Sequence, residues 1–369
     1  MPPAEFRILA INPGSTSTKI AVYTDDRAEW VRCLHHCDAE MEPYRGRPIL
    51  DQLDFRCAVI ETELTGAGYD PHSFDAIAGR GGLMRPIASG TYLVNDAMLA
   101  DLHFAAYGEH ASNMGAFLAQ AIAARGHALA CVVDPVSVDE FTDVARISGT
   151  ALAERHSLSH ALNTKAVAKR FAREQGKSYS DLRLVIAHLG SGISVSAHDS
   201  GRMIDVNLAG QEGPMSTERA GGLQWREVVR LCFSGQYTAE SIYNALFREG
   251  GIYSYLGTKD LREVELRIAE GDAKAALVFD AMLYQVAKEI GGMAAALNGR
   301  VDAILLTGGM ARSRKLITRL RAAIQWIAPV VLYPGEDELQ ALAEGALRVL
   351  RGEEVARELA PDASALLPA

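Results

Sequence analysis

The sequence predicts an α/β fold built from two similar halves, and three observations point to it. Apolar runs rich in β-branched residues alternate along the chain with segments of helical period. Residues 7–18 realign without a gap on residues 183–194, at a constant offset of 176 (183 − 7). The length of 369 residues also suits two domains of about 150 residues better than one.

The expected elements follow from these periodicities. We expect six main strands, at residues 6–11, 20–23, 128–133, 184–187, 303–306 and 330–332. We expect six long helices, at residues 112–124, 160–174, 223–233, 273–298, 313–327 and 338–351, several opened by Ser or Asp and closed by Gly. The helix-rich stretch 223–298 reads as an insertion beside a sheet.

Composition narrows the class of protein and its partners. Hydrophobic residues make up 49% and charged residues 22%, which is typical of a folded globular chain. A net charge of −9 without a long Lys/Arg run argues against nucleic acid or an anionic membrane as a partner. The five cysteines, the absence of a signal pattern and the lack of 18 uninterrupted apolar residues predict a cytoplasmic protein.

The repeated segment is a strand, a polar residue, a Gly-Ser turn and a second strand. Small residues in such a turn let backbone N–H groups approach an anion while hydroxyls donate further hydrogen bonds. The simpler interpretation is an ordinary tight β-turn, but its recurrence at a fixed offset favours two phosphate-binding hairpins. No Walker A pattern is present. The candidate nucleotide-binding residues are Asn12, Gly14, Ser15, Ser17 and Lys19 in the first copy and His188, Gly190, Ser191 and Gly192 in the second.

Six motifs in order resemble the acetokinase family, and the butyrate kinases within it. They are Asn-Pro-Gly-Ser-Thr-Ser-Thr-Lys at 12–19, Asp-Pro-Val-Ser-Val-Asp at 134–139, Ala-Arg-Ile-Ser-Gly at 145–149, Ser-His-Ala-Leu-Asn at 159–163, His-Leu-Gly-Ser-Gly at 188–192 and Gly-Pro-Met-Ser-Thr-Glu-Arg at 213–219. The family belongs to the superfamily of acetate and sugar kinases, heat-shock ATPases and actin. The resemblance runs from the first strand to the C-terminal helix.

The resemblance implies a two-lobed, duplicated ribonuclease-H-like fold of the actin-like ATPase type, with nucleotide in the cleft between lobes. The first lobe would comprise residues 1–150 with the returning helix in 335–369, and the second 151–334. The implied reaction is reversible phosphoryl transfer from ATP to a short-chain fatty acid, most simply butyrate, giving ADP and an acyl phosphate. Mg²⁺ is the implied cofactor, and the apolar helices make a homo-oligomer plausible.

Such a transfer brings an anionic carboxylate to an anionic phosphate, so positive charge must lie at the site. Arg80, in a run of glycines, and Arg219, in the turn 218–222, are the candidates. By similarity to acetate kinase, Arg80 would hold the substrate carboxylate and Arg219 the transferring phosphoryl group. Without that context, both arginines read as surface residues in turns.

Mg²⁺ requires hard oxygen ligands, and two carboxylates are candidates. Asp134 ends an apolar strand, where ligands bind in α/β sheets, and Glu338 begins the last helix. The resemblance assigns both to the metal. Glu338 also suits a purely structural role, because an acidic residue at a helix N-terminus stabilises the helix dipole.

Histidines and a third glycine turn complete the expected site. His188 is expected to face the phosphates, and His160 to donate a hydrogen bond near the phosphoryl group, with His156 as the alternative. Gly308 and Gly309 resemble the family's adenosine-binding turn, although an ordinary strand-to-helix reversal explains them too.

Other features were weighed against this interpretation. The segment Cys33-Leu-His35-His36-Cys37 suggests zinc, but its side chains would splay along a strand and no second cluster completes the site. Residues 274–293 read as core or subunit packing rather than a membrane anchor. Gly81 and Gly82 replace valines of acetate kinases, which implies a roomier acyl pocket.

An actin-like or chaperone-like nucleotide switch is the second hypothesis for the function of the protein, and a structural assembly protein is the third.

Overall fold

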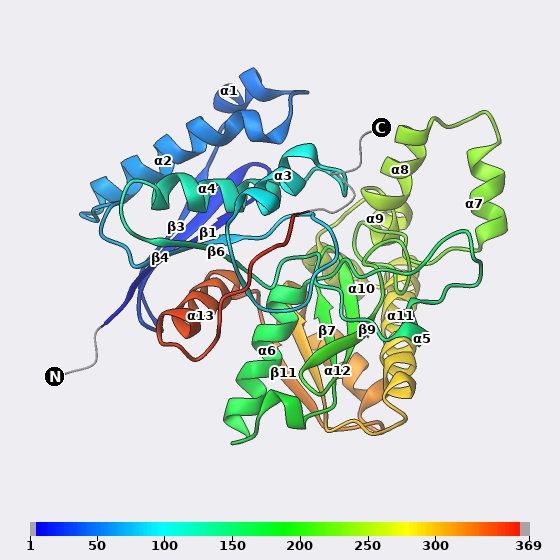
Figure 1. The fold of residues 1–369 in the computed structure, drawn as a ribbon. Helices are drawn as coiled ribbons and strands as arrows, with labels where there is room; N and C mark the ends of the chain where they lie inside the picture. Colours follow the sequence, from blue (N-terminus) through cyan, green and yellow to red (C-terminus); the bar gives the residue numbers. More distant parts are fainter. Residues whose placement is uncertain (1–4, 362–369) are drawn as a thin grey trace. The chain divides into compact units, whose positions relative to one another are not determined.

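A computed structural model describes residues 5–361 (Figure 1). It divides into two compact units, one formed by Met1–Val138 with Asp337–Ala369 and the other by Asp139–Glu336. We refer to these as unit 1 and unit 2. The ends of the predicted lobes, residues 1–4 and 362–369, lie outside the described residues.

Unit 1 contains a six-stranded sheet with the order β3-β2-β1-β4-β6-β5. β1 pairs antiparallel with β2 and parallel with β4, and β4 pairs parallel with β6. The carboxyl ends of β1, β4 and β6 therefore meet along one edge of the sheet. The strands are β1 (Arg7–Pro13), β2 (Ser17–Thr24), β3 (Arg27–His35), β4 (Ala76–Arg80), β5 (Thr91–Leu93) and β6 (Leu129–Val133).

Helices cover both faces of this sheet, with α2 and α4 on one side and α13 on the other (Figure 1). A tight backbone approach seats α4 on β4, since a Cβ on Gly79 would lie 2.0 Å from the Gly115 carbonyl oxygen. The helices of unit 1 are α1 (Asp38–Met41), α2 (Leu53–Gly66), α3 (Asp96–Phe104), α4 (Met114–Ala123) and α13 (Glu338–Leu350), with 3₁₀ turns η1 (Glu42–Tyr44), η2 (Ile49–Gln52) and η3 (Ala111–Asn113).

Unit 2 contains a five-stranded sheet with the order β11-β10-β7-β8-β9. Its strands are β7 (Leu184–Leu189), β8 (Ile193–Asp199), β9 (Arg202–Val206), β10 (Ala303–Gly308) and β11 (Val330–Pro334). An antiparallel three-stranded meander continues into two parallel strands, as in β3-β2-β1-β4-β6 of unit 1. The predicted duplication is thus confirmed at the level of sheet topology.

Five helices lie in the chain between β9 and β10, where an insertion was predicted. The last of them packs directly on the sheet, because Phe279, Met282 and Val286 are buried against its strands in one apolar core. The helices of unit 2 are α5 (Asp143–Arg146), α6 (Ala161–Glu174), α7 (Trp225–Cys232), α8 (Ala239–Phe247), α9 (Gly251–Leu256), α10 (Leu261–Ala269), α11 (Ala273–Ala296) and α12 (Arg314–Ile324), with η4 (Tyr179–Asp181) and η5 (Gly309–Arg312).

The predicted strands and helices are confirmed, with ends shifted by a few residues. The predicted core role of residues 274–293 is confirmed as well, since α11 buries its apolar face in unit 2. Across residues 5–361, no helix has the length and apolar character needed to cross a membrane.

Candidate active site

Three predicted site residues of unit 1 stand in a row at the edge where the parallel strands end. Asn12 lies near the end of β1, Arg80 ends β4, and Asp134 directly follows β6. The registers Ile11↔Gly79 and Arg80↔Val133 place them on neighbouring strands. The sheet therefore gathers these side chains at the edge where α/β proteins bind their ligands.

Glu338 joins this row from the first turn of α13. Its Oε2 accepts hydrogen bonds from Asn12 Nδ2 at 2.5 Å and from Arg80 Nη1 at 2.8 Å. Arg80 Nη1 also donates to Asn12 Oδ1 at 3.4 Å. The side chains of Arg80 and Glu338 are only 21% and 9% exposed, so this is a built cluster rather than a solvated surface pair. Glu338 still lies at a helix N-terminus, so its structural role is compatible with the cluster.

Asp134 is buried and held in a left-handed backbone conformation, with φ of 38°. Its Oδ1 accepts from the Ser89 hydroxyl at 2.6 Å and from the Gly90 N–H at 2.8 Å. Non-glycine residues rarely adopt positive φ, and Asp is among those that tolerate it best. A strained backbone and fixed hydrogen bonds at a strand end are typical of a functional carboxylate.

The donor set of unit 1 fits a Mg²⁺ ion that shares its coordination with phosphates and water. Within residues 5–361, no group of three or more His, Cys, Asp or Glu side chains could hold a metal by itself. Mg²⁺ usually takes only one or two protein carboxylates, which Asp134 and Glu338 could supply. The sequence prediction for the metal is thus compatible with the geometry and stays a prediction.

The first Gly-Ser hairpin connects β1 and β2. The Gly14 N–H donates to the Ser17 carbonyl at 2.7 Å, which closes a tight turn, and the side chains of Ser15 and Lys19 are exposed. A residue that sequence analysis missed, Arg56 of α2, donates to the carbonyl oxygens of this turn. Nothing in the helical period of α2 distinguishes a buried arginine from a surface one.

The predicted residues of unit 2 gather around the second hairpin, between β7 and β8. A Cβ on Gly192 would lie 2.5 Å from Arg219 Nη1 and 3.4 Å from His160 Cε1. A Cβ on Gly190 would lie 3.1 Å from His188 Nε2. The two glycines therefore allow both histidines and the arginine to lie directly against the turn.

The two histidines are stacked, with ring centroids 3.8 Å apart and planes at 5°. His160 Nδ1 contacts the Ser194 hydroxyl at 2.6 Å, and His188 Nδ1 contacts Asn163 Oδ1 at 2.8 Å. The other ring nitrogen of His188, Nε2, lies 3.2 Å from Glu336 Oε1, so oxygen acceptors face both nitrogens of this ring. These contacts fix both rings, whereas His156 is exposed and makes none of them. The geometry favours His160 over His156.

Arg219 has a polar atom for which the described residues provide no partner. Its Nη1 donates to the Ala209 carbonyl at 3.2 Å, and the guanidinium lies 4.4 Å from the centroid of the Phe247 ring. Its Nε is buried and unpaired. Burial lowers the pKa of the guanidinium, which still stays charged at neutral pH. The contact between the Ser216 hydroxyl and the Ser191 carbonyl ties the arginine's turn to the hairpin.

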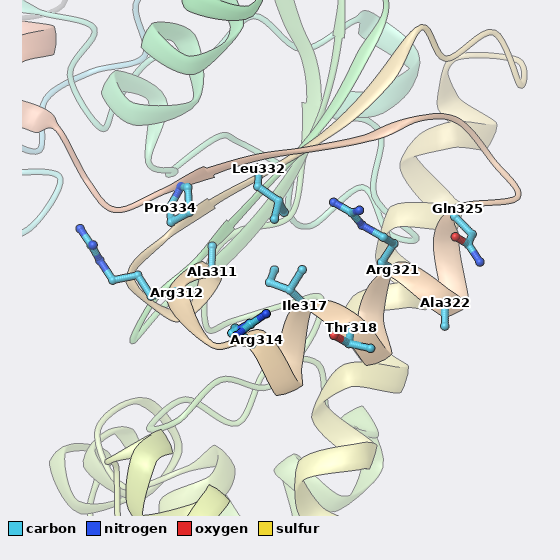
Figure 2. Close-up of a pocket in the computed structure, with 10 residues that line it drawn as sticks. All are labelled: Ala311, Arg312, Arg314, Ile317, Thr318, Arg321, Ala322, Gln325, Leu332 and Pro334. Carbon is cyan, nitrogen blue, oxygen red and sulfur yellow. The ribbon is translucent and has the colours of Figure 1, made fainter.

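The third glycine turn follows β10. Gly308 has φ of +88°, and a Cβ there would lie 2.4 Å from the Leu189 carbonyl oxygen, so the packing of β10 against β7 itself requires glycine. A Cβ on Gly309 would have nothing within 4 Å. Next to the turn is a groove of about 730 Å³, which Figure 2 shows with Ile317 and Leu332 at its centre and Arg312 and Arg314 at its rim. Its size suits a nucleoside-sized ligand.

Two other groups of residues in unit 1 stand out in the sequence, the segment 33–37 and the pair Gly81 and Gly82. Cys33 and Cys37 are free and exposed, and His36 is buried instead against the Thr18 hydroxyl, so no zinc site forms among the described residues. Gly82 does not open an acyl pocket: a Cβ there would lie 2.4 to 2.7 Å from atoms of Asn113. Likewise, a Cβ on Gly81 would lie 2.3 Å from Pro135 Cβ. Close packing within unit 1 is the reason for both glycines.

Comparisons with known proteins agree with this arrangement. Residues 152–327 match the model of the acetokinase family. The chain is 50% identical over 355 residues to Butyrate kinase 1 of Clostridium acetobutylicum, covering 96% of this chain and 99% of that protein.

Solved structures show the fold. An acetate kinase of Porphyromonas gingivalis is 18% identical with a TM-score of 0.76, over 94% of this chain and all of that one. A propionate kinase of Francisella tularensis is 19% identical with a TM-score of 0.69, over 92% and 98% of the two chains. The duplicated sheets thus form the actin-like ATPase fold of these kinases. With half of its residues identical to a relative across nearly its whole length, the chain belongs to the acetokinase family.

Proposed function

We propose that the chain is an ATP-dependent carboxylate kinase that converts a short-chain fatty acid, most simply butyrate, into its acyl phosphate with release of ADP. The observation that carries the proposal is Arg219, whose buried Nε has no partner among the described residues although it lies against a Gly-Ser hairpin and two fixed histidines. An unpaired buried donor of this kind costs stability, which an incoming anion repays. The 50% identical butyrate kinase supports the choice of acid.

In unit 1, Arg80 would bind the carboxylate of the acid. Its guanidinium pairs with the carboxylate of Glu338 at 2.8 Å, and this contact supports a carboxylate as its partner. Asp134 and Glu338 would hold Mg²⁺, which when bound neutralises charge on the phosphates. Asn12, Gly14, Ser15, Ser17 and Lys19 would bind phosphate through the hairpin.

In unit 2, Arg219 and His160 would stabilise the charge on the transferring phosphoryl group. His188, Gly190, Ser191 and Gly192 would bind nucleotide phosphates. No residue needs to act as a general base, because the attacking carboxylate is ionised at neutral pH. An oxygen of that carboxylate bonds to the γ-phosphorus as the bond to the ADP oxygen breaks. Gly308 and Gly309 would lie against the adenosine, with the neighbouring groove as a site for its base.

The remaining parts of the proposal concern organisation. We propose that units 1 and 2 are the two lobes expected from the family resemblance, that the enzyme works in the cytoplasm, and that it forms a homo-oligomer. Its partners would be the nucleotide and the fatty acid alone.

The experiment that tests the proposal traps acyl phosphate with hydroxylamine. The purified protein is supplied with MgATP and, in turn, acetate, propionate, butyrate, isobutyrate or valerate. We expect most hydroxamate from butyrate and none above background from Arg80→Ala. Equal hydroxamate yields from all five acids would refute the choice of butyrate, and no hydroxamate from any acid would refute the carboxylate kinase.

A further inference from the structure

The guanidinium of Arg56 is a buried cation beside the first Gly-Ser hairpin. Arg56 belongs to α2 of unit 1, and its side chain is completely buried. Among residues 5–361, no carboxylate forms an ion pair with it. Burial lowers its pKa to about 10, so it keeps its charge at neutral pH. A buried charge without a counter-ion is expensive, which indicates a function beyond packing.

The donors of this guanidinium are directed at the hairpin. Nη1 donates to the carbonyl oxygens of Gly14 at 2.8 Å and Ser17 at 3.2 Å, and Nη2 donates to that of Ser15 at 2.9 Å. Nη2 and Nε also donate to Gln52 Oε1, at 2.8 and 3.1 Å. Gln52 thus anchors the guanidinium, and three carbonyl groups of the turn point towards the guanidinium.

The direction of these carbonyls determines where the amides point. In a trans peptide, the C=O of one residue and the N–H of the next lie on opposite sides of the peptide bond. Because the carbonyls of Gly14 and Ser15 face Arg56, the N–H groups of Ser15 and Thr16 face away from it. Backbone N–H groups presented together in a turn form an anion-binding concavity.

Thr18 and His36 hold the other side of the turn through hydrogen bonds and add no charge. The Thr18 hydroxyl accepts from Arg56 Nη1 at 3.0 Å, so its own proton is available to His36 Nε2 at 2.9 Å. The backbone N–H of His36 donates to the Thr16 carbonyl at 3.0 Å. Burial and the Arg56 charge lower the pKa of His36, while Glu40 opposes that shift. Neutral His36 leaves Arg56 as the charge behind the hairpin.

We propose that Arg56 is a positioning residue that holds the first hairpin with its amides outward and supplies the buried positive charge that attracts a phosphate of ATP to it. The inference rests on the proposed function, since it assumes that this hairpin binds phosphate. Arg56 itself is screened from the ligand by the turn that it holds, so it acts through the hairpin rather than by contact.

The test measures binding of adenosine 5′-(β,γ-imido)triphosphate with Mg²⁺ by calorimetry, beside thermal unfolding. Arg56→Met keeps much of the length of the side chain but removes its charge and its N–H donors. We expect its Kd for the analogue to rise about tenfold or more. The Kd of Arg56→Lys should rise less, because lysine keeps the charge and loses only the several N–H donors of the guanidinium. In steady-state assays the KM for ATP should rise in the same order.

Controls separate positioning from mere stability. Arg348→Met removes a different arginine of unit 1, partly buried and paired with Glu354 at 2.8 Å, and should lower the unfolding temperature without changing the Kd. If Arg56→Met does not fold, Gln52→Leu releases the anchor while keeping the charge, and should raise the Kd about threefold. A Kd unchanged from wild type in Arg56→Met, or in Gln52→Leu where Arg56→Met is not obtained, would overturn the proposal.

The failure of the proposed function is distinguishable from the failure of this inference, because binding is measured without any fatty acid. A wild-type protein that binds the analogue but leaves butyrate unphosphorylated would refute the substrate alone. A wild-type protein that does not bind the analogue would refute both.

Discussion

The replacement Arg219→Met is expected to abolish activity while leaving stability nearly unchanged. Methionine keeps much of the length and apolar contact of arginine but has no donor and no charge. If Arg219 stabilises the transferring phosphoryl group, kcat should fall by about 10²- to 10³-fold or more. Such a separation of activity from stability is not expected of a residue that serves the fold.

The stability balance follows from the contacts of the side chain. The variant loses a hydrogen bond to the Ala209 carbonyl, worth about 0.5–1.5 kcal/mol, and the contact with the Phe247 ring, worth about 0.5–2 kcal/mol. It is relieved of an unpaired buried Nε, which costs about 1–3 kcal/mol. These terms cancel to within about 1 kcal/mol, or about 2–4 °C in Tm for a unit of this size.

Arg155 of the same unit provides a matched control. It pairs with Asp205 at 3.0 Å and Glu212 at 3.1 Å and is partly buried, with 26% of its side chain exposed. Arg155→Met should therefore lower stability by about 1–3 kcal/mol and leave kcat close to wild type. Differential scanning calorimetry and the hydroxamate assay provide the two readouts. The reasoning is refuted if Arg219→Met unfolds more than about 8 °C below wild type, or if it keeps its kcat.

Four further predictions follow from single positions. Gly308→Ala should lower the free energy of unfolding in urea by about 2 kcal/mol or more, because a Cβ there meets a carbonyl oxygen and the φ is positive. Gly309→Ala, where a Cβ has open space, should change the free energy of unfolding little. Equal effects of the two substitutions would contradict the packing argument. Glu338→Gln keeps the size of the side chain but weakens a metal ligand, so a Mg²⁺ titration of activity should show a higher half-saturating concentration, and an unchanged one would exclude a metal role. The pKa of His198 lies well below 6.5 because it is buried near the Lys165 charge; the unfolded chain therefore binds a proton that the folded chain does not, and the urea midpoint should fall as pH drops below 6.5, with a flatter slope in His198→Asn. Gly82→Val should lower Tm and activity with every acid alike, and a selective loss of butyrate activity would restore the acyl-pocket interpretation.

Much of the fold could be predicted because hydrophobic period and repetition are local signals. The strand–turn–strand around Gly14 recurs around Gly190, and the two sheets have matching strand order. Strand β4, with its glycine and arginine, and the exposed β3 gave weaker apolar patterns and were not predicted. The core role of α11 could be predicted from its apolar residues, but nothing in the sequence shows which core it joins, that beside the sheet of unit 2.

The site was predictable to the extent that its residues end strands. Asn12 and Asp134 follow apolar runs, whereas Arg80 was singled out by the glycines around it. Neighbouring parallel strands bring all three to one edge. The link from Glu338 to Asn12 and Arg80 spans most of the chain, so no local pattern could reveal it. Arg56 was missed, and the contact of Asn163 was not predicted, for a related reason, since their partners are backbone carbonyls or a histidine on another element.

The prediction that Gly81 and Gly82 make the acyl pocket roomier was wrong because of the direction in which their Cβ atoms would point. A sequence shows that a side chain is missing but not where its Cβ would point. In the structure the two positions face Pro135 and Asn113, so the absent side chains leave room for side-chain and backbone atoms of the protein itself.

The central claim is that this chain transfers a phosphoryl group from ATP to a carboxylate. The most direct measurement follows ATP, ADP, inorganic phosphate and butyryl phosphate by ³¹P nuclear magnetic resonance in one reaction with Mg²⁺ and butyrate. The account predicts butyryl phosphate and ADP in equal amounts, and neither when butyrate is left out. Inorganic phosphate released at the same rate with and without butyrate, and no acyl phosphate signal, would contradict it and favour a nucleotide switch.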